Sequence, residues 1–157
     1  METLAPTQTC RHARIRIETR RPTEFIDVTD RIEAIVAGSG VRDGLVNVQS
    51  LHTTTGIVVN EHEPLLHGDF AALLARLAPA EHAYRHDDMA VRTVNISPGE
   101  RPNGHSHCRA LLLGTAVLLN LAGGRLQLGR WQRVFVVETD GPRSREISVL
   151  VLGEAGR

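Results

Sequence analysis

The sequence has few cysteines, few aromatic residues and no excess of either charge. Its 157 residues include two cysteines, Cys10 and Cys108, which are too few for a disulfide framework and are not spaced as a CxxC metal half-site. Eighteen basic and eighteen acidic residues balance each other. This balance argues against a nucleic acid as the main partner, because such proteins carry a basic surface.

Long apolar runs are also absent. The longest apolar stretch, residues 110–121, is interrupted by Gly114, Thr115 and Asn120. It falls short of the roughly 20 apolar residues that cross a bilayer. No signal peptide is recognisable at the start, and the scarcity of cysteine suits a reducing compartment. We therefore expect a cytoplasmic protein without a membrane helix.

The strand and helix patterns predict one α+β domain over residues 12–157, after a frayed segment over residues 1–11. Apolar and polar residues alternate in residues 13–19 and 45–51, which is typical of half-buried strands. Apolar residues recur at helical spacing after Pro64, and a shorter helix is expected near residues 30–37. Four more strands follow residue 113, with connections too short for parallel crossovers. We expect mainly antiparallel sheets with two main helices.

Residues 80–109 show little periodicity and contain four of the eight histidines. A stretch of this length without regular elements is usually functional or disordered, and the histidines favour a functional segment. His105 and His107 form an HxH pair, and His86 precedes two aspartates. Together with His52 they provide the imidazole and carboxylate mixture that suits zinc. On composition alone, a scatter of surface histidines accounts for them equally well.

Charged residues of two further segments are candidates for chemistry. Glu61 lies just before the long helix and Asp69 lies further along it. Acidic residues at a helix start offset the helix dipole, which accounts for Glu63 but less well for Glu61 and Asp69. The segment 140–145 contains Arg143 and a second arginine, which could hold a phosphate. An ordinary hairpin turn explains the same segment. Arg109, beside the histidine pair, is a second candidate phosphate ligand.

A series of short motifs resembles the YjbQ/UPF0047 family in order and spacing. The motifs cover most of the chain: His52-Thr53-Thr54-Thr55-Gly56, Asn60-Glu61, Asp69, His86-Asp87, Ser106-His107, Leu113-Gly114, Gly124-Arg125-Leu126, Leu128-Gly129, Trp131-Gln132 and Asp140-Gly141-Pro142-Arg143. The chain departs from the family at Leu119-Asn120, where Ile-Pro is common, and at Arg130, where threonine is common. A bulky cation at residue 130 would alter substrate preference if it lined the pocket.

The resemblance implies an α+β fold, a homotrimer, and a pocket at subunit interfaces lined by histidine and acidic residues. It also implies a secondary thiamine-phosphate synthase activity, which joins an aminopyrimidine diphosphate to a thiazole phosphate and releases pyrophosphate. We therefore expect an enzyme whose partner is a small phosphorylated molecule. The alternatives are a metal-dependent hydrolase of unknown substrate and a non-enzymatic trimeric binder of a phosphorylated metabolite.

Site roles follow from the resemblance and from this chemistry. The expected metal ligands are His52, His86 and His107; the expected catalytic residues are Glu61, Asp69 and His107; the expected substrate-binding residues are Thr54, Asn60, Arg109 and Arg143. The divalent metal could be zinc or magnesium. Imidazole ligands favour zinc, because magnesium prefers oxygen ligands.

Overall fold

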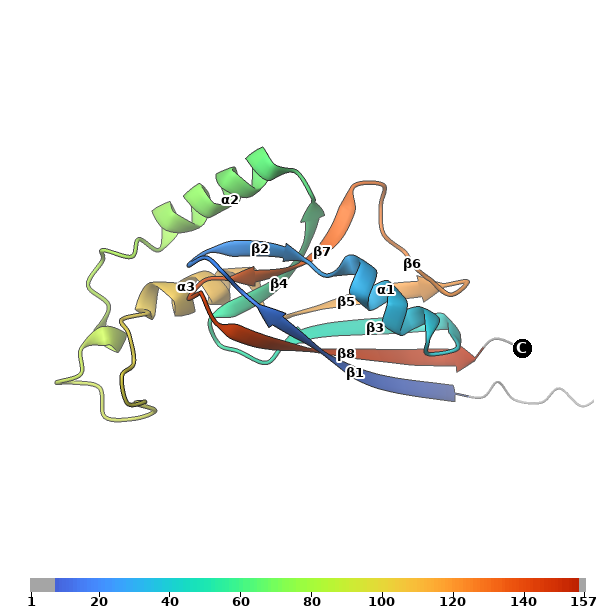
Figure 1. Cartoon of the computed structure of the whole chain (residues 1–157), viewed down its shortest axis with the longest axis horizontal. Coiled ribbons are helices and arrows are strands. Elements are labelled where there is room, and N and C mark those ends of the chain that lie inside the picture. Colours follow the sequence, from blue (N-terminus) through green and yellow to red (C-terminus); the bar gives the residue numbers. More distant parts are fainter. Residues whose placement is uncertain (1–7, 156–157) are drawn as a thin grey trace, which may run out of the picture.

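Alternating apolar residues form two antiparallel sheets in the computed structural model, which describes residues 8–155 (Figure 1). The larger sheet has the strand order β1-β8-β3-β5-β6. Its strands are β1 (Gln8–Glu18), β8 (Ser144–Ala155), β3 (Val41–Ser50), β5 (Ala116–Ala122) and β6 (Arg125–Leu126). The smaller sheet has the order β2-β7-β4, with β2 (Glu24–Asp27), β7 (Gln132–Glu138) and β4 (Thr55–Glu61). These sheets confirm the predicted α+β class.

The main core lies between the two sheets and is closed by α1 (Thr29–Ala37). The buried face of the larger sheet contributes Val46 and Val48 from β3 and Val149 from β8, all with no exposed surface. Strand β7 is buried on both faces. Val134 and Val136 face this core, whereas Phe135 and Val137 belong to a second cluster.

The second cluster packs under α2 (Pro64–Leu77) and α3 (Gly104–Leu113). Helix α2 begins where expected, because the Glu63 carboxylate accepts hydrogen bonds from the amides of Leu65 and Leu66 at 2.9 and 2.7 Å. Figure 1 shows α2 and α3 on the side of the smaller sheet away from β8 and β1. The fold is therefore layered as large sheet, small sheet and helices. No helix within residues 8–155 has the length and apolar character to cross a membrane.

Two elements differ from the expectation. Helix α3 begins at Gly104, within the segment 80–109 for which no regular element is predicted, and continues to Leu113. Residues 8–155 therefore contain three α-helices where two main ones were expected. Strand β1 begins at Gln8, inside the segment expected to be frayed, and residues 1–7 lie outside the described residues.

The start of α3 explains why it escaped prediction. Asp87, in the short 3-10 turn η1 (Arg85–Asp87), accepts hydrogen bonds through Oδ1 from the amides of Asn103 and Gly104, each at 2.9 Å. The carboxylate thus supplies the N-terminal cap from a distant part of the chain. A sequence window around Gly104 cannot show that contact.

Candidate functional site

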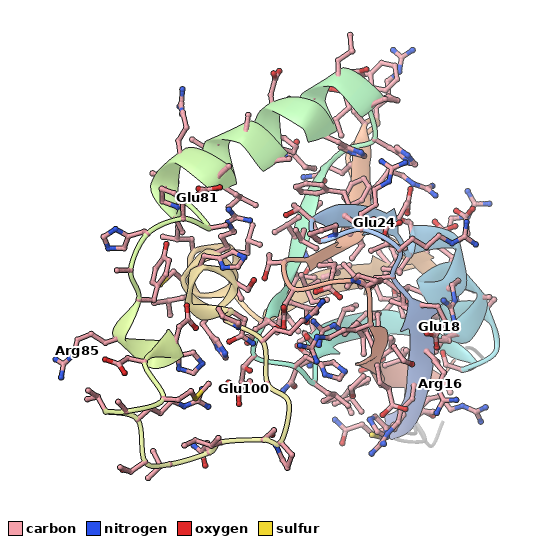
Figure 2. The ribbon with its side chains drawn as sticks, turned by 60° about the vertical axis from the view of Figure 1, so that its left-hand side comes forward. Arg16, Glu18, Glu24, Glu81, Arg85 and Glu100 are labelled. Carbon is pink, nitrogen blue, oxygen red and sulfur yellow. The ribbon has the colours of Figure 1, made fainter. Side chains whose placement is uncertain are left out.

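A cavity of about 600 Å³ lies at one end of the two sheets, beside α3. Its lining residues come from residues 51–54 between β3 and β4, residues 97–103 before α3, His107 on α3, residues 140–143 after β7, and Arg145 at the start of β8. Figure 2 labels Glu100 on the segment that runs beside α3. The motifs predicted from His52, His107 and Arg143 therefore meet in one place.

A buried ion pair forms one wall of the cavity. Glu138 is fully buried and accepts hydrogen bonds from Nε and Nη2 of Arg145 at 2.6 and 2.7 Å. Burial alone would raise the pKa of Glu138, but the bonds from Arg145 and from the Asp140 amide outweigh it and lower the pKa. Arg145 Nη2 also donates to Thr54 Oγ1 at 3.0 Å. The ionised pair therefore fixes both Arg145 and Thr54 at the cavity.

Asp140 organises a second group of polar side chains. Its Oδ2 is 2.8 Å from Nη2 of Arg143 and accepts a hydrogen bond from Nδ2 of Asn103 at 3.1 Å. Arg101 donates to the Asp140 carbonyl at 3.0 Å, and its Nη2 lies 3.4 Å from Oδ1. One carboxylate is thus shared by two arginines.

His52 has a defined tautomer. Its Nε2 accepts a hydrogen bond from the backbone N–H of Glu146 at 2.9 Å, so the ring proton of neutral His52 sits on Nδ1. Burial, and then the nearby Arg145 charge, lower the pKa of His52. The ring is therefore neutral near pH 7, with Nδ1–H available as a donor.

His107 lies against His86, with ring centroids 4.5 Å apart. Burial, and then the His86 ring, lower the pKa of His107. His86 itself lies beside Arg92, whose Nη1 is 3.2 Å from His86 Nε2, and Arg92 forms an ion pair with Glu100. His107 lines the main cavity, whereas His86 lines a neighbouring depression together with Arg92.

The remaining predicted site residues lie elsewhere. Glu61 ends β4 and Asp69 lies on α2, and both are exposed. Asn60 borders a small apolar cavity of about 130 Å³ between β4 and α2. Arg109 is buried and donates through Nε to the carbonyl of Ala78 at 3.0 Å, so it joins α3 to the end of α2. Of the predicted set, His52, Thr54, His107 and Arg143 meet at the main cavity.

The structure also brings to the cavity three residues for which no role was predicted, Glu100, Arg101 and Asn103, with Glu138 behind them. Asp140 and Arg145, which line it as well, belong to the candidate segment 140–145. Glu138 carried a usable signal, because it is a charged residue at the end of the apolar run 134–137. Arg101 carried none, since it lies in a loop and reaches Asp140 across 39 residues.

The predicted three-histidine metal site is not formed. Within residues 8–155, no group of three or more histidine, cysteine, aspartate or glutamate side chains is placed to hold a metal ion. Nε2 of His52 is engaged by a backbone amide, and His86 and His107 pack ring against ring. The described residues do not fit a metal bound by His52, His86 and His107.

Comparison with known proteins identifies relatives across most of the chain. The sequence model described as UPF0047 protein YjbQ-like matches residues 13–154. A UPF0047 protein of Methanothermobacter thermautotrophicus is 36% identical over 88% of this chain and 89% of its own length. A UPF0047 protein of Archaeoglobus fulgidus is 37% identical over 88% of this chain and 98% of its own length.

Solved structures agree with the fold. A YbjQ-like protein of unknown function from Sulfolobus solfataricus superposes with a TM-score of 0.86 at 32% identity, covering 94% of this chain and 100% of the other. An uncharacterized conserved protein of the yjbq/upf0047 family from Clostridium acetobutylicum gives a TM-score of 0.77 at 32% identity, covering 87% and 97%.

These findings correct the predicted activity. The relatives are described by family only or as being of unknown function, and none is described as a thiamine-phosphate synthase. The metal site on which the predicted synthase and the alternative metal-dependent hydrolase relied is not formed among the described residues. The prediction of a thiamine-phosphate synthase with a histidine-bound metal is therefore wrong.

Family membership rests on agreement between sequence and fold. The matched region runs from β1 to β8 and includes every segment that lines the cavity. The curated relatives are matched over nearly their whole length, and the solved relatives share the arrangement of the elements. This chain belongs to the YjbQ/UPF0047 family.

Proposed function

We propose that the main cavity binds a small phosphorylated molecule. The observation that carries this proposal is the sharing of the Asp140 carboxylate by Arg101 and Arg143. Arg145 is matched by Glu138, and Arg92 by Glu100. One positive charge at the cavity is therefore left without its own carboxylate, and an arginine fork suits phosphate oxygens.

The exposure of these groups supports the same reading. The side chains of Arg101 and Arg143 are 53% and 39% exposed, whereas Asp140 is only 8% exposed. An entering anion therefore meets the guanidinium groups before it meets the carboxylate. The Nδ1–H of neutral His52 and the hydroxyl of exposed Thr53 are further donors on the same cavity wall.

Isothermal titration calorimetry with inorganic phosphate and pyrophosphate, at constant ionic strength, tests this proposal. We expect Arg143→Gln to weaken binding about tenfold or more, since a hydrogen bond to a charged group contributes roughly 1.5–3 kcal/mol. Arg76→Gln, in the last turn of α2 and not among the residues that line the cavity, is the matched control and should leave binding unchanged. The proposal fails if neither anion binds, or if both variants bind as the wild type does.

A second candidate function is enzymatic proton transfer on the bound molecule. It is favoured because burial lowers the pKa of His107, so its neutral ring can accept a proton near pH 7, while Nδ1–H of neutral His52 is a donor at the same cavity. The test incubates the protein with a mixture of phosphorylated metabolites and follows it by mass spectrometry. A compound consumed by the wild type but not by His107→Gln would support catalysis; equal profiles would argue against it.

We further propose that the chain forms a homotrimer and works in the cytoplasm. Leu45, Leu118 and Leu152 lie on the outer face of the larger sheet and are 40%, 64% and 38% exposed, which favours a covered face. Cys10 and Cys108 are both free and exposed, which suits a reducing compartment.

A further inference from the structure

The main cavity has an unusual lining for a small-molecule site. Ligand pockets are usually lined mostly by apolar and aromatic side chains. Among the described residues, no phenylalanine, tyrosine or tryptophan lines this cavity, and its apolar members are Leu51, Pro98 and Pro142, apart from a glycine. Aromatic ligand groups commonly bind by stacking on such rings, and the cavity offers no ring of that kind.

Both imidazoles that line the cavity are held in place by other groups. The ring of His52 is held at its edge by the Glu146 amide. The ring of His107 packs against His86 at a centroid distance of 4.5 Å and an interplanar angle of 60°. The cavity is therefore equipped to bind by hydrogen bonds and charge.

Asn103 supplies a second, independent observation. Its side chain lines the cavity and is buried, with 7% of the residue exposed. Nδ2 donates to Asp140 at 3.1 Å, which fixes the orientation of the amide. Oδ1 is then buried without a hydrogen-bond donor among the described residues. Such an unpaired acceptor costs roughly 1–3 kcal/mol, and a ligand donor that displaces the groups covering Oδ1 would relieve this cost.

Glu100 is a further acceptor that lines the cavity, with a side chain that is 13% exposed. Its Oε2 accepts from Arg92 and from the Ser97 amide, whereas Oε1 accepts from Arg92 and keeps a second lone pair for another donor. The cavity thus combines an arginine-rich anion subsite with neighbouring acceptors that call for O–H or N–H donors. A molecule with a phosphate next to several hydroxyls satisfies both.

We infer that the ligand is a phosphorylated polyol of the sugar-phosphate class, with a hydroxyl donating to Oδ1 of Asn103, rather than an aromatic phosphate. This inference rests on the proposed phosphate site and adds the identity of the organic part. Asn103 is then the residue that distinguishes a sugar phosphate from phosphate alone.

Calorimetric titrations with three probes test the inference: inorganic phosphate, ribose 5-phosphate and phenyl phosphate, at one pH above the second ionisation of each. Ribose 5-phosphate should bind at least about tenfold more tightly than phenyl phosphate, which corresponds to roughly one good hydrogen bond. Asn103→Leu should weaken ribose 5-phosphate about five- to tenfold while phosphate itself changes less than about twofold. Asn60→Leu, on β4 outside the cavity, is the matched control.

Asn103 directly precedes α3, so the leucine variant could also weaken the helix start. Asn103→Ser keeps a side chain that is common at helix starts, and it is measured as a second variant. Thermal unfolding of both variants shows whether they are folded. Both variants should show the same selective loss. If phenyl phosphate binds as tightly as ribose 5-phosphate, or if the variants lose inorganic phosphate equally, the polyol assignment is overturned while the phosphate site stands. If none of the three probes binds the wild type, the proposed phosphate site itself fails.

Discussion

Glu138 is a buried carboxylate with five donors around it: two from Arg145, the amides of Thr139 and Asp140, and the hydroxyl of Thr19. Glu138→Gln would leave the Arg145 guanidinium buried without a counter-charge. Breaking a buried pair in this way costs about 3–5 kcal/mol, so we expect a loss of that order in the free energy of unfolding, measured by urea denaturation.

Glu146→Gln is the matched control for this measurement, because it removes another arginine–glutamate pair, which joins β8 to Arg14 on β1. The Arg14–Glu146 pair is 2.8 Å long, and its side chains are 62% and 33% exposed. Exposed pairs contribute roughly 0–1 kcal/mol. Equal losses in the two variants would show that Glu138 has no special structural role.

The Asp27 carboxylate makes part of the free energy of unfolding depend on pH in the acid range. Burial alone would raise its pKa, but hydrogen bonds from Arg133, Thr29 and His62 lower it to about 2. Because the folded pKa lies below the unfolded value near 3.8, the stabilisation is present above about pH 4 and disappears as the pH falls toward 2. After allowance for solvent screening we expect it to contribute about 1 kcal/mol.

Denaturation of Asp27→Asn at several pH values between about 5 and 2 measures this contribution. Over that pH range, the free energy of unfolding of the variant should fall by about 1 kcal/mol less than that of the wild type. Asp69→Asn, at an exposed position on α2, should follow the wild-type curve. If the free energy of unfolding of the Asp27 variant falls with pH as steeply as that of the wild type, Asp27 does not make this contribution.

At the scale of elements, Gly104 decides how α3 docks. A Cβ at residue 104 would lie 2.5 Å from Cβ of Tyr84, beside η1. Gly104→Ala should therefore destabilise the protein by about 1–3 kcal/mol, although alanine favours helices. Gly68→Ala, in α2 with nothing within 4 Å of the new Cβ, should stabilise it by up to about 1 kcal/mol. Opposite shifts in thermal unfolding are the expected result, and Gly104→Ala more stable than wild type would contradict it.

The elements that could be predicted from the sequence are those with local signals. Helix α2 has helical spacing, Pro64 at its start and Glu63 as its cap. The strand alternation around Val46 and Val48 matches the buried face of β3. Helix α3 depends on Asp87, which lies 17 residues before Gly104, so its start is set by tertiary structure.

The site could be predicted only in part for the same reason. His52, Thr54, His107 and Arg143 belong to recognisable motifs, and the cavity contains all four. The role of each residue depends on hydrogen-bond partners that are remote in the chain. For example, His52 accepts a hydrogen bond from the amide of Glu146, which is 94 residues away. That bond commits Nε2 of His52 and helps to explain why the expected metal site is not formed.

At the scale of the whole molecule, we expect three chains to associate through the outer face of the larger sheet, where Leu45, Leu118 and Leu152 are exposed. Sedimentation equilibrium of the wild type should give three times the 17.2 kDa chain mass. Leu118→Asp, 64% exposed on β5, should shift the mass toward that of one chain, because a charge is costly to bury. Leu65→Asp, 80% exposed on α2, is the control and should keep the assembled mass. A monomeric wild type would refute the trimer.

The place of β8 between β1 and β3 has a consequence for biosynthesis. Gln8 pairs with Glu154 and Glu18 with Ser144, so β1 leaves the ribosome more than 120 residues before its partner exists. At about 5–20 residues per second, that interval is on the order of ten seconds. During it Ile15 and Ile17 have no sheet to enter, and the emerging strand is open to aggregation. Production of this protein should therefore depend on chaperones that shield nascent chains, and pauses in translation before residue 144 should lower its yield.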